Sequence, residues 1–273
     1  MKISFKYVVL SILCLILVNF ASFQIQSTDI RVYVQEDGSA KVTEDFTIYI
    51  QGDESIKIYE ESSTTLSRNN IQSWFYKLQL PNLIYHIGGQ QVNIENLVII
   101  PEPVQKIYDN GYTIISISYN VLPSSKFNNE TDSKGLFVLK NIKPRTTQYT
   151  LNKFAFLDTN ENGDLILPQN TKLTFLLPEG AKITSINPVP DSLRDTLPPY
   201  YISTIFWSKP IMPKFMLEFE IEETLEYEIV EFFYFIQTKI TELIKGSEGV
   251  PIIIIIIIIV LSVFYIHKIT KKD

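Results

Sequence analysis

Hydrophobic and polar positions alternate along most of the chain, with a period of two residues. Ile30, Val32 and Val34 alternate with polar residues, and a second alternating run follows an Asp-Gly pair at positions 37 and 38. Two such runs around an Asp-Gly turn are typical of a β-hairpin. Further strand-like runs span residues 55–59, 73–80, 91–100, 111–121, 135–139, 146–157, 164–167, 171–177, 181–186, 200–207 and 214–222.

The spacing of these runs predicts the fold class. Many short alternating strands with no helical stretch between them predict a mainly β fold of antiparallel, β-sandwich-like units. A polar loop at residues 124–134 divides the strand-like runs into two halves of similar length. We therefore expect one sandwich-like unit at residues 24–123 and a second at residues 135–224.

The hydrophobic period changes to 3.6 residues between residues 226 and 245, which indicates an amphipathic juxtamembrane helix. The polar face of this helix is mostly acidic, whereas helices that lie on a membrane surface favour basic residues there. We therefore expect the apolar face to pack against the β domain, or to dock an envelope protein. The partner-binding residues would be Phe232, Phe233, Ile236 and Ile240.

The two ends of the chain predict its topology. Lys2 and Lys6 precede an apolar block, so residues 1–23 are a signal peptide or, because Asn19 spoils the cleavage site, an uncleaved N-terminal anchor. Residues 250–266 contain eight consecutive isoleucines and no charge, and as a helix they would reach about 25 Å. We expect a single-pass transmembrane helix here in preference to a buried strand.

Lysines in residues 267–273 indicate a cytoplasmic tail, so the bulk of the chain would be extracytoplasmic and anchored in the cell membrane. The predicted span contains no ionisable group of the kind that proton and ion pathways need, which makes it an anchor. Cys14 is the only cysteine, and it lies in the N-terminal block. A cysteine-free exterior favours a prokaryotic envelope, of archaeal or Gram-positive-like topology, over a eukaryotic one.

Composition excludes several functions. The 273 residues have a net charge of −6, and no basic run interrupts the middle of the chain, which argues against nucleic-acid binding. Glycine-rich phosphate or dinucleotide motifs are absent from the sequence, so we expect no nucleotide. His86 is the only histidine between the terminal segments, and without a cysteine there it supports no His/Cys zinc site. We expect His86 to be a structural or surface histidine and the protein to be non-enzymatic.

One short loop has the pattern of a calcium site. Asp158, Asn160 and Asn162 supply oxygen side chains at positions 1, 3 and 5 of an EF-hand-like loop, followed by Gly163 and then Asp164. Position 12 is a glutamine and cannot supply the usual bidentate carboxylate. The competing interpretation is a plain hairpin with a type I′ turn at Asn162 and Gly163.

The hairpin motif of residues 37–44, Asp-Gly-Ser-Ala-Lys-Val-Thr-Glu, resembles the opening of uncharacterised archaeal and bacterial membrane-anchored ectodomains. Those proteins combine a signal, a β-rich exterior and a C-terminal span. The resemblance is confined to this motif, and it implies no activity and no role for any residue.

These observations predict a non-enzymatic, membrane-anchored surface protein whose β domains make protein contacts in the cell envelope. A calcium-dependent or carbohydrate-binding adhesion module is the first alternative, because exposed aromatic side chains can bind sugars. A carboxylate-based glycosidase is the second, because two acids facing across a cleft at about 5–10 Å could perform that chemistry.

Overall fold

The computed structural model describes residues 22–88, 92–127, 130–132, 134–143, 145–193, 201–222, 233–239 and 241–242. The chain forms two compact units, residues 1–221 and residues 222–273. Within the described ranges, no helix is long and apolar enough to cross a membrane. Residues 1–21 of the predicted N-terminal segment lie outside the described residues, and so does the predicted span at residues 250–266.

The first hairpin has the form that the sequence predicts. Strand β1 (Ser22–Val34) pairs antiparallel with β2 (Ala40–Gln51). Gly38 lies in the connecting turn at φ +81°, where its N–H donates to the Gln35 carbonyl at 3.0 Å, and the Asp37 carboxylate accepts from the Ser39 N–H. Glycine adopts this left-handed conformation without a steric penalty, so the Asp-Gly pair fixes the turn.

β1 and β2 belong to a seven-stranded sheet with the order β13-β11-β1-β2-β5-β3, in which β4 also pairs with β5. Its other strands are β3 (Ile94–Pro101), β4 (Gln105–Ile107), β5 (Asn110–Val121), β11 (Thr171–Leu176) and β13 (Thr204–Trp207). β1 and β11 run parallel, with Thr28 opposite Thr171. The sheet is therefore mixed, and the prediction of purely antiparallel sheets was wrong: alternation shows which face a side chain takes, but not the direction of the neighbouring strand.

The parallel pair also joins strands from both sides of the polar loop at residues 124–134, so the two predicted halves share one sheet. A four-stranded sheet has the order β12-β15-β9-β8, and two short pairs are β10–β14 and β6–β7. The bounds are β6 (Ser125–Phe127), β7 (Glu130–Asp132), β8 (Phe137–Lys143), β9 (Thr146–Leu151), β10 (Leu165–Ile166), β12 (Lys182–Asn187), β14 (Ile211–Met212) and β15 (Met216–Glu222).

Aromatic side chains pack the two larger sheets together. Phe137 of β8 meets Phe175 of β11 edge to face, with ring centroids 6.3 Å apart, and it also contacts Phe219 of β15 at 5.3 Å. Tyr149 of β9 stacks on Phe219 at 4.6 Å. Since all four rings are buried, they form the core between the sheets.

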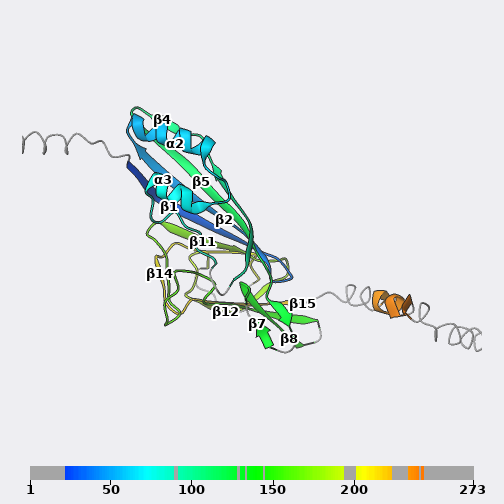
Figure 1. The fold of residues 1–273 in the computed structure, drawn as a ribbon. Helices are drawn as coiled ribbons and strands as arrows, with labels where there is room; N and C mark the ends of the chain where they lie inside the picture. Colours follow the sequence, from blue (N-terminus) through cyan, green and yellow to red (C-terminus); the bar gives the residue numbers. More distant parts are fainter. Residues whose placement is uncertain are drawn as a thin grey trace, which may run out of the picture. The chain divides into compact units, whose positions relative to one another are not determined.

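Two helices replace strands that the sequence predicts. Helices α2 (Asp53–Thr65) and α3 (Ile71–Leu78) occupy the runs at residues 55–59 and 73–80. The buried positions of α3, Trp74 and Leu78, are four residues apart, which is a helical spacing. Figure 1 shows both helices beside the long strands β1, β2 and β5 at one end, and β8, β12 and β15 towards the opposite end.

The helices cover the inner face of the seven-stranded sheet. The Tyr59 hydroxyl of α2 bonds to Thr113 of β5 at 2.9 Å and donates to the Glu102 carbonyl at 2.9 Å. The inward positions of β2 include Val42, Phe46 and Ile48, all of which are fully buried. One face of the sheet thus contributes to the core, while the other is left partly exposed.

Candidate functional site

The outer face of the seven-stranded sheet is identified by the burial pattern of β5. Odd-numbered residues from Gly111 to Val121 are buried, and even-numbered residues are at least partly exposed. Side chains of residues directly opposite on neighbouring strands share a face. Val98 and Ile100 lie opposite Ser118 and Ser116, so both point outward.

Five large apolar side chains gather on this outer face near the β3–β4 edge of the sheet. Ile107 lies opposite Asn110, and Tyr112 lies between Tyr49 on one side and Gln105 on the other, so both side chains belong to the outer face. Tyr108 in the β4–β5 turn is 95% exposed, and the other four are 40–52% exposed. We call this surface the edge patch; it consists of Val98, Ile100, Ile107, Tyr108 and Tyr112.

The edge patch has an acidic border. Glu95, Glu102 and Asp109 are exposed in the segment that contains β3 and β4. Lys106 is the only basic residue between positions 94 and 112, and its ammonium lies 3.4 Å from the Glu60 carboxylate. Arg68 also adjoins β3, because its carbonyl accepts from the Ile99 N–H at 2.6 Å. The three carboxylates therefore outnumber the basic side chains beside them, Lys106 and Arg68.

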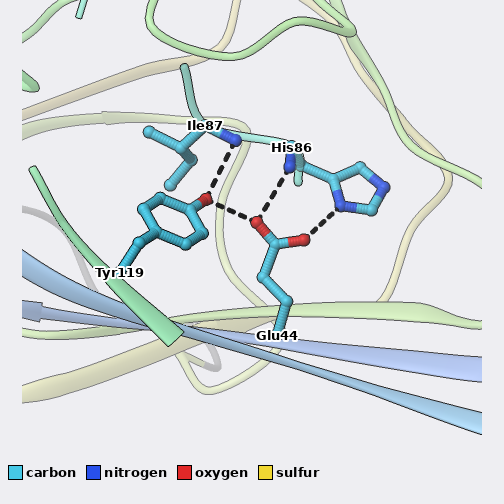
Figure 2. Close-up of polar contacts among 4 residues, drawn as sticks. All are labelled: Glu44, His86, Ile87 and Tyr119. Carbon is cyan, nitrogen blue, oxygen red and sulfur yellow. Dashed lines mark hydrogen bonds and ion pairs between the residues drawn. The ribbon is translucent and has the colours of Figure 1, made fainter. Parts of the chain in front are cut away.

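A buried polar cluster lies on the opposite, inner face of the same sheet (Figure 2). Glu44 of β2 accepts hydrogen bonds from the backbone N–H of His86 at 2.8 Å and from the Tyr119 hydroxyl of β5 at 2.5 Å. His86 Nδ1 lies 2.6 Å from Glu44 Oε2, and the Ile87 N–H donates to the Tyr119 hydroxyl at 3.2 Å. The His86 and Glu44 side chains are only 1% and 0% exposed. We call these residues the Glu44–His86 cluster.

The cluster fastens a loop to the sheet. The His86 carbonyl accepts from the Leu157 N–H at 2.9 Å, and the Gly88 N–H donates to the Ala155 carbonyl at 2.9 Å. The ring of Phe46 stacks on the imidazole, with centroids 6.0 Å apart. Residues 86–88 therefore bridge the seven-stranded sheet and the segment at residues 155–157.

Electrostatics favour a proton on His86. Burial by itself would lower the pKa of His86, but the charge of Glu44, its hydrogen bond and the charge of Asp158 raise that pKa above its ordinary value. Burial, together with the Glu44 carboxylate, raises the pKa of Tyr119 well above its ordinary value. Burial also raises the pKa of Asp158, against the opposing charge of His86.

The cluster has the residue types of an acid–base site, but it is enclosed. Among the described residues, His86 Nε2 and Asp158 Oδ2 are buried atoms that no protein group hydrogen-bonds. A catalytic acid or base must come within hydrogen-bonding distance of its substrate. Because the side chains of Glu44 and His86 are out of contact with solvent, this geometry favours holding a proton and a loop over catalysis.

The predicted calcium loop forms a tight turn whose oxygens accept hydrogen bonds within the protein. Asn160 Oδ1 accepts from the N–H groups of Asn162 and Asp164, at 3.0 and 2.9 Å. Asp164 accepts from the Lys214 N–H at 2.9 Å and from the Asn160 amide at 3.0 Å, and these bonds lower its pKa. Within the described ranges, no group of three or more His, Cys, Asp or Glu residues is placed to hold a metal. Calcium binding through Asp158, Asn160, Asn162 and Asp164 stays a prediction.

The turn differs in type from the predicted one. The Gly163 N–H donates to the Asn160 carbonyl at 3.0 Å, and in this turn only Gly163 has a positive φ, of +82°. A type I′ turn needs positive φ at both central residues, so the turn covers residues 160–163 with glycine at its end.

The predicted partner-binding helix lies in the second unit. Residues 233–239 and 241–242 are helical. Phe233 is exposed and Ile236 is half-buried, whereas Phe232 and Ile240 lie outside the described residues. Docking of a partner on this face stays a prediction.

Acidic residues also line an open depression beside the β1–β2 turn. Its volume is about 600 Å³, and Glu36, Asp37 and Glu179 contribute to its wall. One carboxylate, that of Asp37, accepts from the Ser39 N–H as part of the turn. The glycosidase hypothesis stays a prediction.

Sequence reasoning expected His86 to be a structural or surface histidine and did not identify its partners. Glu44 occupies an inward position in β2, between Val42 and Phe46. A carboxylate at an inward position of an otherwise apolar face is a signal that the sequence does contain, because buried charges are almost always paired. The patch was missed because it combines residues of three strands.

Comparisons with known proteins give little further guidance. No family model matches the chain, and no curated protein matches it. Among solved structures, the folded domain of the Mycobacterium tuberculosis protein LppM, determined by NMR, is similar to 76% of this chain and 95% of its own length. The sequence identity is 13% and the TM-score is 0.23, so this likeness assigns neither a site nor a function.

Proposed function

We propose that the chain is a non-enzymatic, membrane-anchored extracytoplasmic protein that makes protein contacts in a prokaryotic, archaeal-type cell envelope. The edge patch is the observation behind this proposal. Single exposed apolar residues are normal on protein surfaces, whereas contiguous apolar patches mark interaction sites. On β5 the outward positions Asn110 and Tyr112 lie opposite Ile107 and Gln105 of β4, and the outward positions Ser116 and Ser118 lie opposite Ile100 and Val98 of β3, so the edge patch draws on both strands that pair with this side of β5.

The composition of the edge patch favours a protein partner over a sugar. Tyrosines such as Tyr108 and Tyr112 are enriched in protein interfaces, where one side chain supplies both apolar area and a hydroxyl. Val98, Ile100 and Ile107 are branched aliphatic side chains, which offer no flat ring on which a sugar could stack. The acidic border formed by Glu95, Glu102 and Asp109 favours a partner with an apolar centre and a basic rim.

The predicted anchor determines where this contact would occur. Residues 250–266 would hold the chain in the membrane, with the β unit outside and residues 267–273 in the cytoplasm. Alkaline carbonate washing should leave the protein in the membrane fraction, and protease added to spheroplasts should digest the β unit. Digestion of a C-terminal epitope tag from the outside would overturn this topology.

Site-specific photocrosslinking in native membranes tests the contact. A photoreactive residue replaces Tyr108 in the full-length protein, and a matched control replaces Tyr76 of α3, which is 73% exposed but outside the edge patch. We expect a discrete protein adduct from position 108 alone. The adduct should disappear when Ile107→Ser is added, and it should weaken at high salt because of the acidic border.

Equal adducts at both positions, or an adduct that Ile107→Ser leaves unchanged, would contradict the proposal. An adduct containing glycan in place of protein would instead support a carbohydrate-binding adhesion module. Repeating the reaction with calcium and with EDTA separates a calcium-dependent contact from a calcium-independent one.

A further inference from the structure

We propose that His86 is a proton-operated latch, which in its imidazolium form fastens residues 86–88 to the sheet through Glu44 and which loosens that segment when it loses the proton. The latch is independent of the edge patch and of the location of the protein, so the two proposals stand or fall separately. The latch has three requirements. Residues 86–88 must be attached to the seven-stranded sheet mainly through Glu44, and the proton on His86 must change the strength of that attachment. No other cation near Glu44 must replace the positive charge when His86 loses its proton.

The attachment converges on one carboxylate. Glu44 accepts hydrogen bonds from the backbone N–H of His86, from the His86 ring and from the Tyr119 hydroxyl. The Tyr119 hydroxyl in turn accepts a hydrogen bond from the Ile87 N–H. The backbone N–H and the Nδ1 atom of His86 thus both bond to the same side chain of β2. The remaining bonds of the segment run through the His86 carbonyl and the Gly88 N–H to residues 155–157.

The proton changes the charge of an enclosed pair. A neutral imidazole can still donate to Glu44 through Nδ1, but it leaves the buried carboxylate without a positive charge beside it. A buried carboxylate without a cation beside it is strongly disfavoured, whereas in the pair of His86 imidazolium and Glu44 carboxylate each charge neutralises the other. The His86–Glu44 contact therefore weakens when the proton leaves.

Two of the titratable groups around His86, Glu44 and Asp158, raise its pKa. Glu44 lies on β2 and Asp158 in the segment after β9; the other titratable groups nearby are Tyr119 on β5 and the adjacent Tyr85, whose ring meets that of Tyr119 edge to face with centroids 5.9 Å apart. Among the described residues, no lysine or arginine forms an ion pair with Glu44 or with Asp158. His86 is therefore the cation of this cluster, and its loss of a proton is uncompensated.

The sign of the pH dependence follows from the folded state. Because the pKa of His86 is raised on folding, the native state binds this proton more tightly than the unfolded chain does. The stabilisation is complete below the unfolded pKa, about 6.5, and it disappears as the pH rises through the folded pKa.

Hydrogen exchange with mass spectrometry measures the latch in the full-length protein in detergent micelles with EDTA. After correction for intrinsic exchange, protection of peptides that cover residues 84–88 should fall as the pH rises from about 5 to about 9. The fall should not exceed about tenfold per pH unit, since one proton is released. Peptides from the β1–β2 hairpin should keep their protection.

Two variants, together with an NMR titration of the His86 ring, test whether His86 causes this pH dependence. His86→Gln retains a donor towards Glu44 without a titrating group, so protection of residues 84–88 should no longer change with pH. Asp158→Asn removes a nearby negative charge and should lower the NMR titration midpoint of the His86 ring. Asp164→Asn, in the same loop but bonded to Lys214, is the control and should leave that midpoint unchanged.

A His86 midpoint at or below about 6.5 in the intact protein would overturn the proposal. A pH profile of exchange that persists in His86→Gln would also overturn it. If His86→Gln does not fold, the ring titration of the unaltered protein and of Asp158→Asn still gives a decisive answer.

Discussion

Replacing Glu44 with alanine should destabilise the first unit more than any single surface change. Three donors, the His86 N–H, the His86 ring and the Tyr119 hydroxyl, would lose their acceptor in a region with 0–1% exposure. Charge-assisted bonds contribute about 1.5–3 kcal/mol each, but such terms are not additive. Removing one partner of a buried ion pair costs about 3–5 kcal/mol, which is the loss we expect.

Such a loss would be a large part of the total stability of a domain, about 5–15 kcal/mol. Urea unfolding of the full-length protein in mild detergent measures it, because Trp74 and Trp207 are fully buried on α3 and β13 and report on distant parts of the unit. Glu60→Ala, at a half-exposed ion pair with Lys106, is the control and should cost about 0–1 kcal/mol. A loss below about 1 kcal/mol for Glu44→Ala would refute the reasoning, because the carboxylate would then contribute no more than a surface charge.

Three further changes test local features of the fold. Asn70→Ala removes the side chain that caps α3 and should lower the free energy of unfolding by about 1 kcal/mol in urea. Gly38→Ala should lower the free energy of unfolding by about 1–3 kcal/mol, because φ is positive at this position. The loss should exceed that of Gly180→Ala, since an added Cβ would meet the Leu139 side chain at position 38 but nothing within 4 Å at position 180. Thermal unfolding of the two variants measures the difference. The hydrogen bonds that lower the pKa of Asp164 stabilise the fold above the unfolded value, about 3.9, and this contribution disappears as the pH falls through the folded pKa. Asn160→Ala should therefore raise the NMR titration midpoint of Asp164, and an unchanged midpoint would show that this bond has no such effect.

The sequence contains enough information for the local parts of the fold. The first hairpin follows from alternation and from Asp37 and Gly38, all within a few residues of one another. The run at residues 55–59 was misinterpreted because five residues are too few to distinguish periods of 2 and 3.6. Ile56 and Tyr59 are buried three residues apart in α2, and only the whole helix makes that spacing visible.

The site required information that is distant along the chain. Glu44 bonds to His86, 42 residues later, and to Tyr119, 75 residues later. A charged residue at an inward position of β2 predicts that some partner exists, but not which one. The edge patch depends on the register between β3, β4 and β5, which alternation alone does not fix when the connecting loops are irregular.

The parallel pairing of β1 with β11 affects the order in which the molecule can fold. The Asn170 side chain donates to the Gln26 carbonyl across a separation of 144 residues, so this edge closes only after most of the first unit has been synthesised. β1, β2, β5 and β3 can pair earlier through shorter connections, which leaves the backbone groups along one side of β1 without partners during that interval. High contact order slows folding, and an unpaired strand edge attracts other chains. If the chain is exported from its N-terminus, as proposed, β1 would emerge well before β11 with one edge unpaired. The folding yield should then depend on how quickly residues 171–176 follow.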